Sequence, residues 1–372
     1  MTKTGDTLSG RQRNRALLAR QHLLARVDMS AEQMIEHLVG MQAQSPRNPY
    51  IALWSRLAEF TAPDLETLIK DRRALRLPVM RTTLHLVTAR DAVIMWPVMQ
   101  PVLARVFGSQ KRWPRALEGL DMAALLADGR KLLELQPRTA SELSLALGAN
   151  WDADHEALAS AVHYLTPAVQ VPPRGLWSST GRATWTTLEK YLGRQLVPAT
   201  DTQRDALVLR YLAAFGPASV PDIGTWSGLT GVREIVERLR PRLVTFPGED
   251  GRELLDLPDA PRPPADTPAP PRFMPEYDNL GLSHKDRSHV IPPQAAGRVT
   301  GFVGTFMVDG YLRGQWRVGV VRDVATIEVD AFWPLSSGEG GEVGGEALNL
   351  VRWHSPGAAR HDVAFGPLRK RR

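Results

Sequence analysis

Cysteine is absent from the 372-residue sequence. Its absence excludes disulfide bonds, thiolate zinc sites, iron–sulfur clusters and a cysteine nucleophile. The sequence also lacks the GxxxxGK(S/T) phosphate-binding loop, the HExxH zinc motif and the GxSxG nucleophile elbow. His354 and His361 have no evident third ligand, so we expect neither a metal site nor a cofactor.

Long apolar runs are also missing. Residues 1–6 have no apolar signal core, and no uninterrupted apolar run is long enough to cross a bilayer. We therefore expect a cytoplasmic protein that does not bind a membrane.

The composition is that of a globular protein with a basic charge balance. Hydrophobic residues make up 43% and charged residues 23% of the chain, and its length suggests roughly two to four compact units. Lys and Arg total 46 against 40 Asp and Glu, which gives a net charge of +6. This charge permits a nucleic-acid partner without requiring one.

Residues 202–258 carry the clearest structural pattern. Apolar spacing predicts helices at 204–215 and 232–239, and Ser219 caps a short helix between them. Two strands follow around a glycine-containing turn. Three helices and a hairpin in this order are typical of a winged helix, whose third helix often binds DNA but in many proteins only packs against protein.

Weaker copies of this pattern precede it, and a proline run and a β-rich segment follow it. In the expanded N-terminal copy, helices are predicted at 31–41 and elsewhere, and a strand at 79–81. In the β-rich segment, the glycine-rich stretch 338–345 is expected to be a mobile loop. The predicted organisation is α+β, with winged-helix modules at 8–116, 117–200 and 201–258, a proline-rich linker at 259–272, a β domain at 273–368 and a basic tail at 369–372.

Gln42 and Gln44 follow directly after the predicted helix at 31–41. This helix begins with a capping box at 30–33. Side chains two positions apart point in nearly opposite directions from a helix but share a side of an extended segment. Pro46 disfavours helical backbone at the residue before it and so favours the extended form. The two amides are then expected to point into one space, although glutamines at a helix end are more often solvated or capping groups.

Other polar residues allow two interpretations. His85 alternates out of an apolar strand, and either faces a ligand or, as is more frequent, is a structural histidine. The polar stretch at 283–288 is either a solvated loop or a phosphate contact. The turn at 308–310 is a strong hairpin signal and is either a groove probe or an ordinary hairpin.

Together these motifs resemble the AlkZ/YcaQ family of bacterial winged-helix DNA glycosylases. The resemblance covers nearly the whole chain. It rests on 40–44 (Gly-Met-Gln-Ala-Gln), 80–87 (Met-Arg-Thr-Thr-Leu-His-Leu-Val), 213–218 (Ala-Ala-Phe-Gly-Pro-Ala), 226–229 (Trp-Ser-Gly-Leu), 274–279 (Met-Pro-Glu-Tyr-Asp-Asn), 286–288 (Asp-Arg-Ser), 308–310 (Val-Asp-Gly) and 314–317 (Gly-Gln-Trp-Arg).

The resemblance implies three tandem winged helices packed around a C-terminal β-barrel, which form a basic channel for duplex DNA. It also implies monofunctional hydrolysis of the N-glycosidic bond of N7-alkylguanine, including interstrand cross-links, in base excision repair. The Gln-x-Gln form of the motif is similar to the branch found alongside antibiotic self-resistance. A channel closed by one chain favours a monomer.

In this family a Gln-x-Gln or Gln-x-Asp motif is catalytic, and it maps onto Gln42 and Gln44. Alkylation at N7 makes guanine a cationic leaving group that needs no general acid, so neutral amides can suffice. The residues expected to bind DNA are Arg47, Arg81, His85, Lys285, Arg287, Arg313, Trp316 and Arg317.

Two other functions fit the predicted modules. A winged-helix transcriptional regulator binds DNA without catalysis, and nothing in the module order excludes it. A protein-binding scaffold is a third interpretation, and it predicts little affinity for DNA. The paired amides and three unequal modules in one chain favour the glycosylase.

Overall fold

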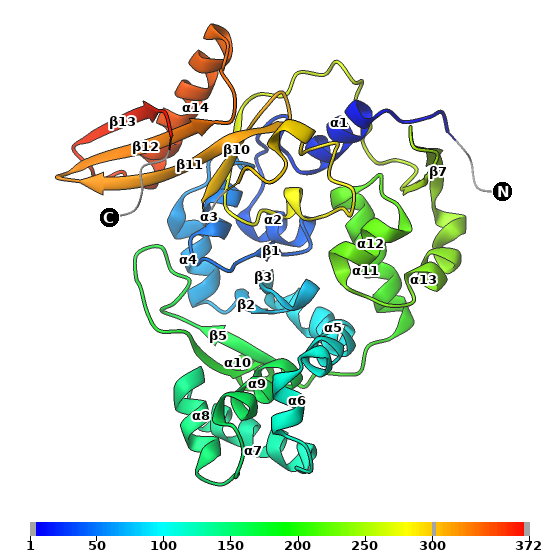
Figure 1. Cartoon of the computed structure of the whole chain (residues 1–372), viewed down its shortest axis with the longest axis vertical. Helices are drawn as coiled ribbons and strands as arrows, with labels where there is room; N and C mark the ends of the chain where they lie inside the picture. Colours follow the sequence, from blue (N-terminus) through cyan, green and yellow to red (C-terminus); the bar gives the residue numbers. More distant parts are fainter. Residues whose placement is uncertain (1–4, 300–302, 368–372) are drawn as a thin grey trace.

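The computed structural model describes residues 5–299 and 303–367, and the predicted basic tail at 369–372 lies outside these residues. The N-terminal part combines helices with short strands (Figure 1). Its elements are α1 (Gly10–Arg20), α2 (Ala31–His37), β1 (Met41–Gln42), α3 (Asn48–Trp54), α4 (Ala62–Lys70), β2 (Ala74–Pro78) and β3 (Leu84–Thr88).

A long helix leads from this part into the second one, which lies at one end of the molecule (Figure 1). The predicted helices of the second part are present with similar bounds, and two further helices precede them. The elements are α5 (Ala89–Ser109), α6 (Arg112–Ala116), α7 (Met122–Leu135), β4 (Arg138–Thr139), α8 (Ala140–Gly148), α9 (His155–Leu165), β5 (Ala168–Val171), β6 (Thr184–Thr187) and α10 (Leu188–Leu192).

The third part has the predicted order of three helices and a hairpin. Ser219 and Asp222 form a capping box at the start of its second helix, and Gly228 ends that helix with φ of 76°. The winged-helix assignment itself stays a prediction. The elements are α11 (Asp201–Phe215), α12 (Val220–Ser227), α13 (Val232–Leu239), β7 (Val244–Pro247) and β8 (Glu253–Asp256).

The first two parts share one sheet. Its strand order is β1-β3-β2-β5-β6-β4, and neighbouring strands run antiparallel. The junction is the β2–β5 pair, where Arg76 lies opposite Gln170. The sequence patterns suggest modules with separate wing strands, whereas this pairing joins strands of the first two parts in one sheet.

The C-terminal strands form an open sheet, and a closed barrel is not seen among the described residues. The order is β13-β12-β11-β10-β9, so β13 and β9 are edges. All pairs are antiparallel except β12 with β13. The strands are β9 (Arg272–Met274), β10 (Gly304–Val308), β11 (Tyr311–Val321), β12 (Val324–Ala331) and β13 (Arg360–Phe365).

The glycine-rich stretch at 338–345 is part of helix α14 (Ser337–His354), so the expectation of a mobile loop is wrong. Ser336 and Glu339 form a capping box at its start. Apolar residues at helical spacing, from Val343 to Val351, are buried in the core beneath the sheet. This burial and the cap outweigh the low helix propensity of glycine.

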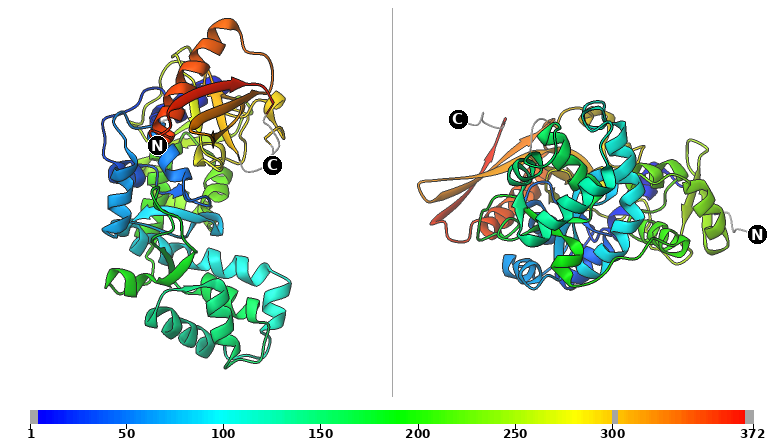
Figure 2. Two further views of the ribbon diagram at one scale, coloured as in Figure 1. Left: turned by 90° about the vertical axis from the view of Figure 1, so that its left-hand side faces the viewer. Right: turned by 90° about the horizontal axis from the view of Figure 1, so that it is seen from below.

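The apolar cores cross the predicted module boundaries. One core joins α1 and α5 to α11, α12 and α13, and another joins α2, α3 and α4 to the C-terminal sheet and α14. The second part has a smaller core of its own. Figure 2 shows this smaller part set apart from the rest of the molecule.

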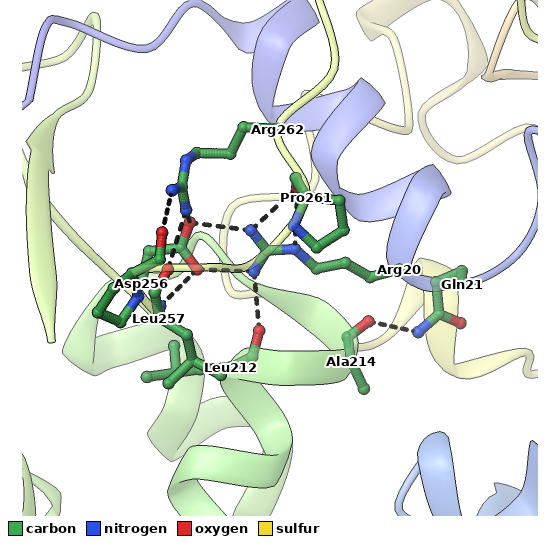
Figure 3. Close-up of polar contacts among 9 residues, drawn as sticks. Arg20, Gln21, Leu212, Ala214, Asp256, Leu257, Pro261 and Arg262 are labelled. Carbon is green, nitrogen blue, oxygen red and sulfur yellow. Dashed lines mark hydrogen bonds and ion pairs between the residues drawn. The ribbon is translucent and has the colours of Figure 1, made fainter. Parts of the chain in front are cut away.

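A buried ion pair ties α1 to the third part (Figure 3). Arg20 binds both carboxylate oxygens of Asp256, at 2.7 and 2.8 Å, and donates to the carbonyl oxygen of Leu212. Gln21, beside it, donates to the carbonyl oxygen of Ala214. Helix α1 is therefore fixed against the third part, although some 190 residues separate them in sequence.

Between β8 and β9 the described chain has no helix or strand, as expected for the proline-rich linker. It nevertheless lies along α1. Arg11 donates to the carbonyl oxygen of Ala265 and Arg15 to that of Thr267, at 2.8 and 2.6 Å. The segment is thus held by arginines of one helix.

Within the described residues, α5 is long and apolar enough to cross a bilayer by length and composition. In this structure 44% of its most apolar window is buried in the protein. Met95 and Val102 lie in the core shared with α11 to α13, and Asp91 forms an ion pair with Arg210 at 2.6 Å. These contacts explain the apolar composition of α5, which is a core helix in this structure.

Candidate active site

Gln42 lies in strand β1, directly after a sharp reversal of the backbone. Helix α2 ends at His37 rather than at residue 41, because Val39 and Gly40 adopt positive φ values of 56° and 88°. A Cβ at Gly40 would lie 2.7 Å from Cγ1 of Val87, so this close approach to β3 requires glycine. The extended backbone predicted for Gln42 is confirmed, and it begins earlier than the proline alone suggested.

The two amides of the motif occupy different environments. Gln42 is only 8% exposed and lies opposite His85 in the β1–β3 pair. Gln44 is exposed, and no hydrogen bond to its side chain is found within the described residues. Between them, the N–H of Ala43 donates to the carbonyl oxygen of Leu84 at 2.7 Å. The motif therefore has one buried amide, that of Gln42, and one exposed amide, that of Gln44.

Arg81 holds the amide of Gln42. Its Nη2 donates to Oε1 of Gln42 at 3.0 Å and to Oδ1 of Asn279 at 3.2 Å. Its Nη1 donates to the carbonyl oxygen of Trp226 at 3.0 Å. One guanidinium thus connects β1, α12 and the segment after β9. Burial lowers the pKa of Arg81 to about 10, so the side chain is charged at neutral pH.

The backbone at Arg81 is strained. Arg81 and Thr82 have φ values of 53° and 60°, in the left-handed region that residues other than glycine rarely adopt. The predicted strand at 79–81 is therefore wrong. The strand is β2, and a tight turn with these two residues follows it. Strain of this kind costs on the order of 1–3 kcal/mol per residue and concentrates at functional sites.

Arg76 holds the backbone of the motif from the other side. It lies on β2, is only 2% exposed, and donates from Nη2 to the carbonyl oxygen of Ala43. Its Nη1 donates to Oε1 of Gln170 on β5. Burial lowers the pKa of Arg76 to about 9. The β2–β5 junction and the motif are thus linked by a single side chain.

A third arginine fixes the segment that carries Asn279. Arg56 binds both carboxylate oxygens of Asp278, at 2.9 and 3.1 Å, and both side chains are almost fully buried. Arg56 also donates to Oε1 of Gln21 at 3.0 Å. Nδ2 of Asn279 donates to the carbonyl oxygen of Gly40 at 3.1 Å. The segment that carries Asp278 and Asn279 is therefore fixed next to Gln42, by Arg56 and by the carbonyl oxygen of Gly40.

A small cavity opens between these elements. Its polar lining consists of amides and of the Arg56–Asp278 pair. Asp278 is the one carboxylate in this lining, and it is engaged by Arg56. Among the described residues that line it, the cavity thus offers no uncommitted carboxylate as a general acid or base. The lining amides are those of Gln21, Gln42 and Asn279.

His85 is fully buried behind the motif. Its Nδ1 donates to the carbonyl oxygen of Thr83 at 2.9 Å, which leaves Nε2 unprotonated and without a partner. Burial and the charge of Arg81 lower the pKa of His85 to about 3, so the ring is neutral at physiological pH. The side chain does not reach the surface.

The residues expected to bind DNA fall into two groups. Arg47, Lys285 and Arg287 are exposed. The others are engaged within the protein. Arg313 and Arg317 form ion pairs with Glu339 and Glu328 at 3.2 and 2.8 Å, and Trp316 is 4% exposed, with Nε1 donating to the carbonyl oxygens of Met274 and Thr305.

The turn at 308–310 is held against α1. Asp309 forms ion pairs with Arg11 and Arg15. Nδ2 of Asn14 donates to the carbonyl oxygen of Gly310 at 2.7 Å, and a Cβ at Gly310 would lie 2.6 Å from two side-chain atoms of α1. The tip is therefore a packed contact, and it is not free to act as a groove probe in this structure.

The opposite end of the same sheet is the exposed one. The β11–β12 hairpin turns at Arg322 and Asp323, which have φ values of 47° and 64°. Val320 and Val321 beside the turn are 55% and 71% exposed. Figure 1 shows these two strands extending away from the rest of the molecule.

Sequence reasoning missed Arg56, Arg76 and Asn279 as site residues. The motif at 274–279 contains Asn279, so its polar composition was a usable signal. Buried arginines give no such signal, because nothing in the sequence shows that Arg56 and Arg76 face the motif. Among the residues that the structure describes, no group of three or more His, Asp or Glu could hold a metal ion.

Known proteins resemble this chain in sequence and in fold. A family model described as DNA glycosylase AlkZ-like matches residues 35–353. The solved structure of Streptomyces sahachiroi DNA glycosylase AlkZ is similar with a TM-score of 0.77, at 20% sequence identity, over 97% of this chain and 100% of that chain. No curated protein matches. At this identity, the structural likeness shows a shared fold.

Proposed function

The chain belongs to the AlkZ-like family of DNA glycosylases, and from this premise we propose that it hydrolyses the N-glycosidic bond of N7-alkylguanine in double-stranded DNA, including bulky adducts and interstrand cross-links. DNA glycosylase activity follows from the family. The choice of lesion rests on one observation, that the cavity at Gln42 is lined by amides and its one carboxylate is engaged by Arg56.

This lining suits a leaving group that is already activated. Alkylation at N7 places a positive charge on guanine. When the C1′–N9 bond breaks, its electron pair moves to N9 and the base departs neutral, without a proton from the enzyme. Water adds to C1′ and releases its proton to solvent. The protein has to place this water and to stabilise the charges that develop on the sugar and on the departing base.

Gln42 and Gln44 are the proposed catalytic residues. Side-chain amides provide both hydrogen-bond donors and acceptors but no charge. They contribute less to the stabilisation of a cationic transition state than carboxylates would. We therefore expect no excision of unmodified purines, whose departure needs protonation of the base.

The proposed DNA contacts are the exposed residues Arg47, Lys285 and Arg287. Their positive charges would neutralise phosphates and position the duplex. The exposed Val320 and Val321 replace the turn at 308–310 as the proposed groove probe, because an apolar hairpin tip can insert beside base pairs. We further propose three winged-helix modules, action as a monomer, and a role in repair or antibiotic self-resistance.

One incubation tests the proposal. Duplex DNA with a single N7-methylguanine is mixed with the protein, and abasic sites are detected by alkaline strand cleavage. We expect cleavage at the modified guanine, none at unmodified purines, and cleavage slowed by about 100-fold, but still measurable, in Gln42→Ala. A transcriptional regulator would bind the duplex without producing abasic sites.

A further inference from the structure

We propose that Arg81 fixes the amide of Gln42 with its oxygen towards the protein, so that in the proposed excision Gln42 acts as a hydrogen-bond donor to the substrate and Gln44 as the acceptor that holds the water. This division of roles rests on the proposed function. It assigns Arg81 as a positioning residue rather than a DNA contact.

The orientation of the Gln42 amide follows from the chemistry of its partner. A guanidinium carries only donors, so the atom of Gln42 that faces Nη2 of Arg81 at 3.0 Å is the oxygen. Asn279 shows the same polarity. Its oxygen faces Arg81 at 3.2 Å, while its nitrogen donates to the carbonyl oxygen of Gly40. Both amides therefore turn their oxygens towards Arg81.

The nitrogen of the Gln42 amide is left for a ligand. No hydrogen bond from Nε2 is found within the described residues, and this atom is not among those sealed from solvent without a partner. Gln42 also lines the cavity. The donor end of this side chain is thus the end that a substrate can reach.

The charge of Arg81 strengthens this end. A hydrogen bond from a cation to an amide oxygen draws electron density towards the oxygen, so the amide N–H groups become better donors. The same bond makes the oxygen a weaker acceptor for a nucleophilic water. A donor stabilises any substrate atom that gains electron density as the glycosidic bond breaks.

Gln44 supplies what Gln42 lacks. Its side chain is exposed, and no hydrogen bond to its oxygen is found within the described residues. Arg76 fixes the backbone between the two residues by binding the carbonyl oxygen of Ala43. The oxygen of Gln44 is therefore available to accept a hydrogen bond from water.

The strained backbone at Arg81 agrees with a positioning role. Arg81 and Thr82 both keep left-handed φ values, and the guanidinium is held by acceptors from separate segments, including the carbonyl oxygen of Trp226. A residue that only filled space would not need this conformation.

Single substitutions to glutamate test the division of roles. Gln42→Glu keeps the shape and places a carboxylate against Arg81, so folding is preserved, but the donor is lost. We expect the single-turnover rate on N7-methylguanine DNA to fall at least about 100-fold, with the DNA dissociation constant within about threefold. Gln44→Glu keeps an acceptor, so its rate should stay within about tenfold and acquire an acidic limb in its pH profile.

A second pair of variants tests the positioning role. Arg81→Lys keeps the charge but cannot reach the acceptors that the guanidinium joins. We expect its excision rate to fall in the wild-type background, and the same change to have no further effect in the Gln42→Ala background. A merely structural role for Arg81 would give an equal loss in both backgrounds.

The outcomes separate this inference from the proposed function. If the wild type releases no N7-methylguanine, the proposed function fails. The orientation is then tested by the side-chain amide NMR signals of Gln42, which should shift in Arg81→Met. A wild-type rate in Gln42→Glu, a loss in Gln44→Glu as large as in Gln42→Glu, or unshifted amide signals in Arg81→Met would overturn the inference.

Discussion

Arg76 donates a hydrogen bond to the carbonyl oxygen of Ala43, the residue between the two glutamines of the motif. The same guanidinium binds Gln170 across the β2–β5 junction. The second part of the chain, which lies at one end of the molecule, is thereby connected to the candidate active site. Arg76 thus holds the backbone of the motif from the β2–β5 junction.

We expect Arg76→Lys to reduce the excision rate by up to about 100-fold, because one ammonium cannot bind both Ala43 and Gln170, and a small displacement of a catalytic group is costly. Affinity for duplex DNA should not change. Single-turnover kinetics and DNA titration measure the two quantities. Arg72→Lys, at an exposed arginine of the same part, is the matched control. A wild-type rate in Arg76→Lys would contradict the role assigned to this residue.

The Arg56–Asp278 pair should contribute strongly to stability. Asp278→Asn leaves a charged arginine in a buried site, which costs about 3–5 kcal/mol. The loss is measured as a shift of the urea unfolding midpoint. Asp250→Asn serves as control, because its partner Arg252 is 59% exposed and such pairs contribute about 0–1 kcal/mol. Equal shifts in the two variants would refute the prediction.

The helices and the hairpin of the third part were predictable because they depend on local signals. The capping box at Ser219 and the apolar spacing of α11 and α13 are all contained in short windows of sequence. The extended conformation of Gln42 was predictable for the same kind of reason. Helix α14 was not predicted because its glycine-rich composition is typical of a loop, although the segment also contains a capping box and apolar residues at helical spacing.

Tertiary pairings were not predictable from the same patterns. The shared sheet depends on β2 meeting β5, and the position of the turn at 308–310 depends on Asp309 meeting two arginines of α1. These partners are far apart in the sequence. The closed barrel implied by the family resemblance also depends on strand pairing at the edges, and the described strands form an open sheet.

The salt dependence of DNA binding should identify the phosphate contacts. Replacing Arg287 by Ala removes an exposed charge, so the slope of log affinity against log salt should fall by about one. Arg317→Ala is the matched control, because Arg317 already binds Glu328 at 2.8 Å. Binding of an undamaged duplex at several salt concentrations gives both slopes. An unchanged slope for Arg287→Ala would exclude this contact.

The exposed hairpin should matter for cross-links more than for small lesions. Changing Val320 and Val321 to Ser removes apolar surface from the tip without affecting a core, so the melting temperature should not change. We expect unhooking of an interstrand cross-link to slow, with excision of N7-methylguanine little changed. Asp309→Ala, at the packed turn, should instead lower the melting temperature, because it leaves buried Arg15 unpaired. Equal loss on both substrates would contradict the hairpin's proposed role.

The buried His85 makes a specific contribution to acid unfolding. Its pKa is lowered to about 3 in the folded protein, chiefly by burial, from an ordinary value of 6.5. Below pH 6.5 the imidazole of His85 is therefore protonated in the unfolded chain but stays neutral in the folded protein. The stability that depends on this histidine is complete above pH 6.5 and is lost as the pH falls towards 3, by up to about 1.4 kcal/mol per pH unit.

His85→Asn should remove this contribution, because Asn can keep the donor to the carbonyl oxygen of Thr83 but does not titrate. The measurement is the unfolding free energy from urea titrations between pH 7.5 and pH 4.5, with each protein's value at pH 7.5 as its own reference. We expect the variant to be less stable than the wild type at pH 7.5. As the pH falls, its unfolding free energy should decrease less steeply, and the difference between the two slopes should approach the value for uptake of one proton. His22 and His284, whose pKa values burial lowers to about 4, still contribute in both proteins. Parallel curves for wild type and variant would mean that the His85 pKa is not depressed.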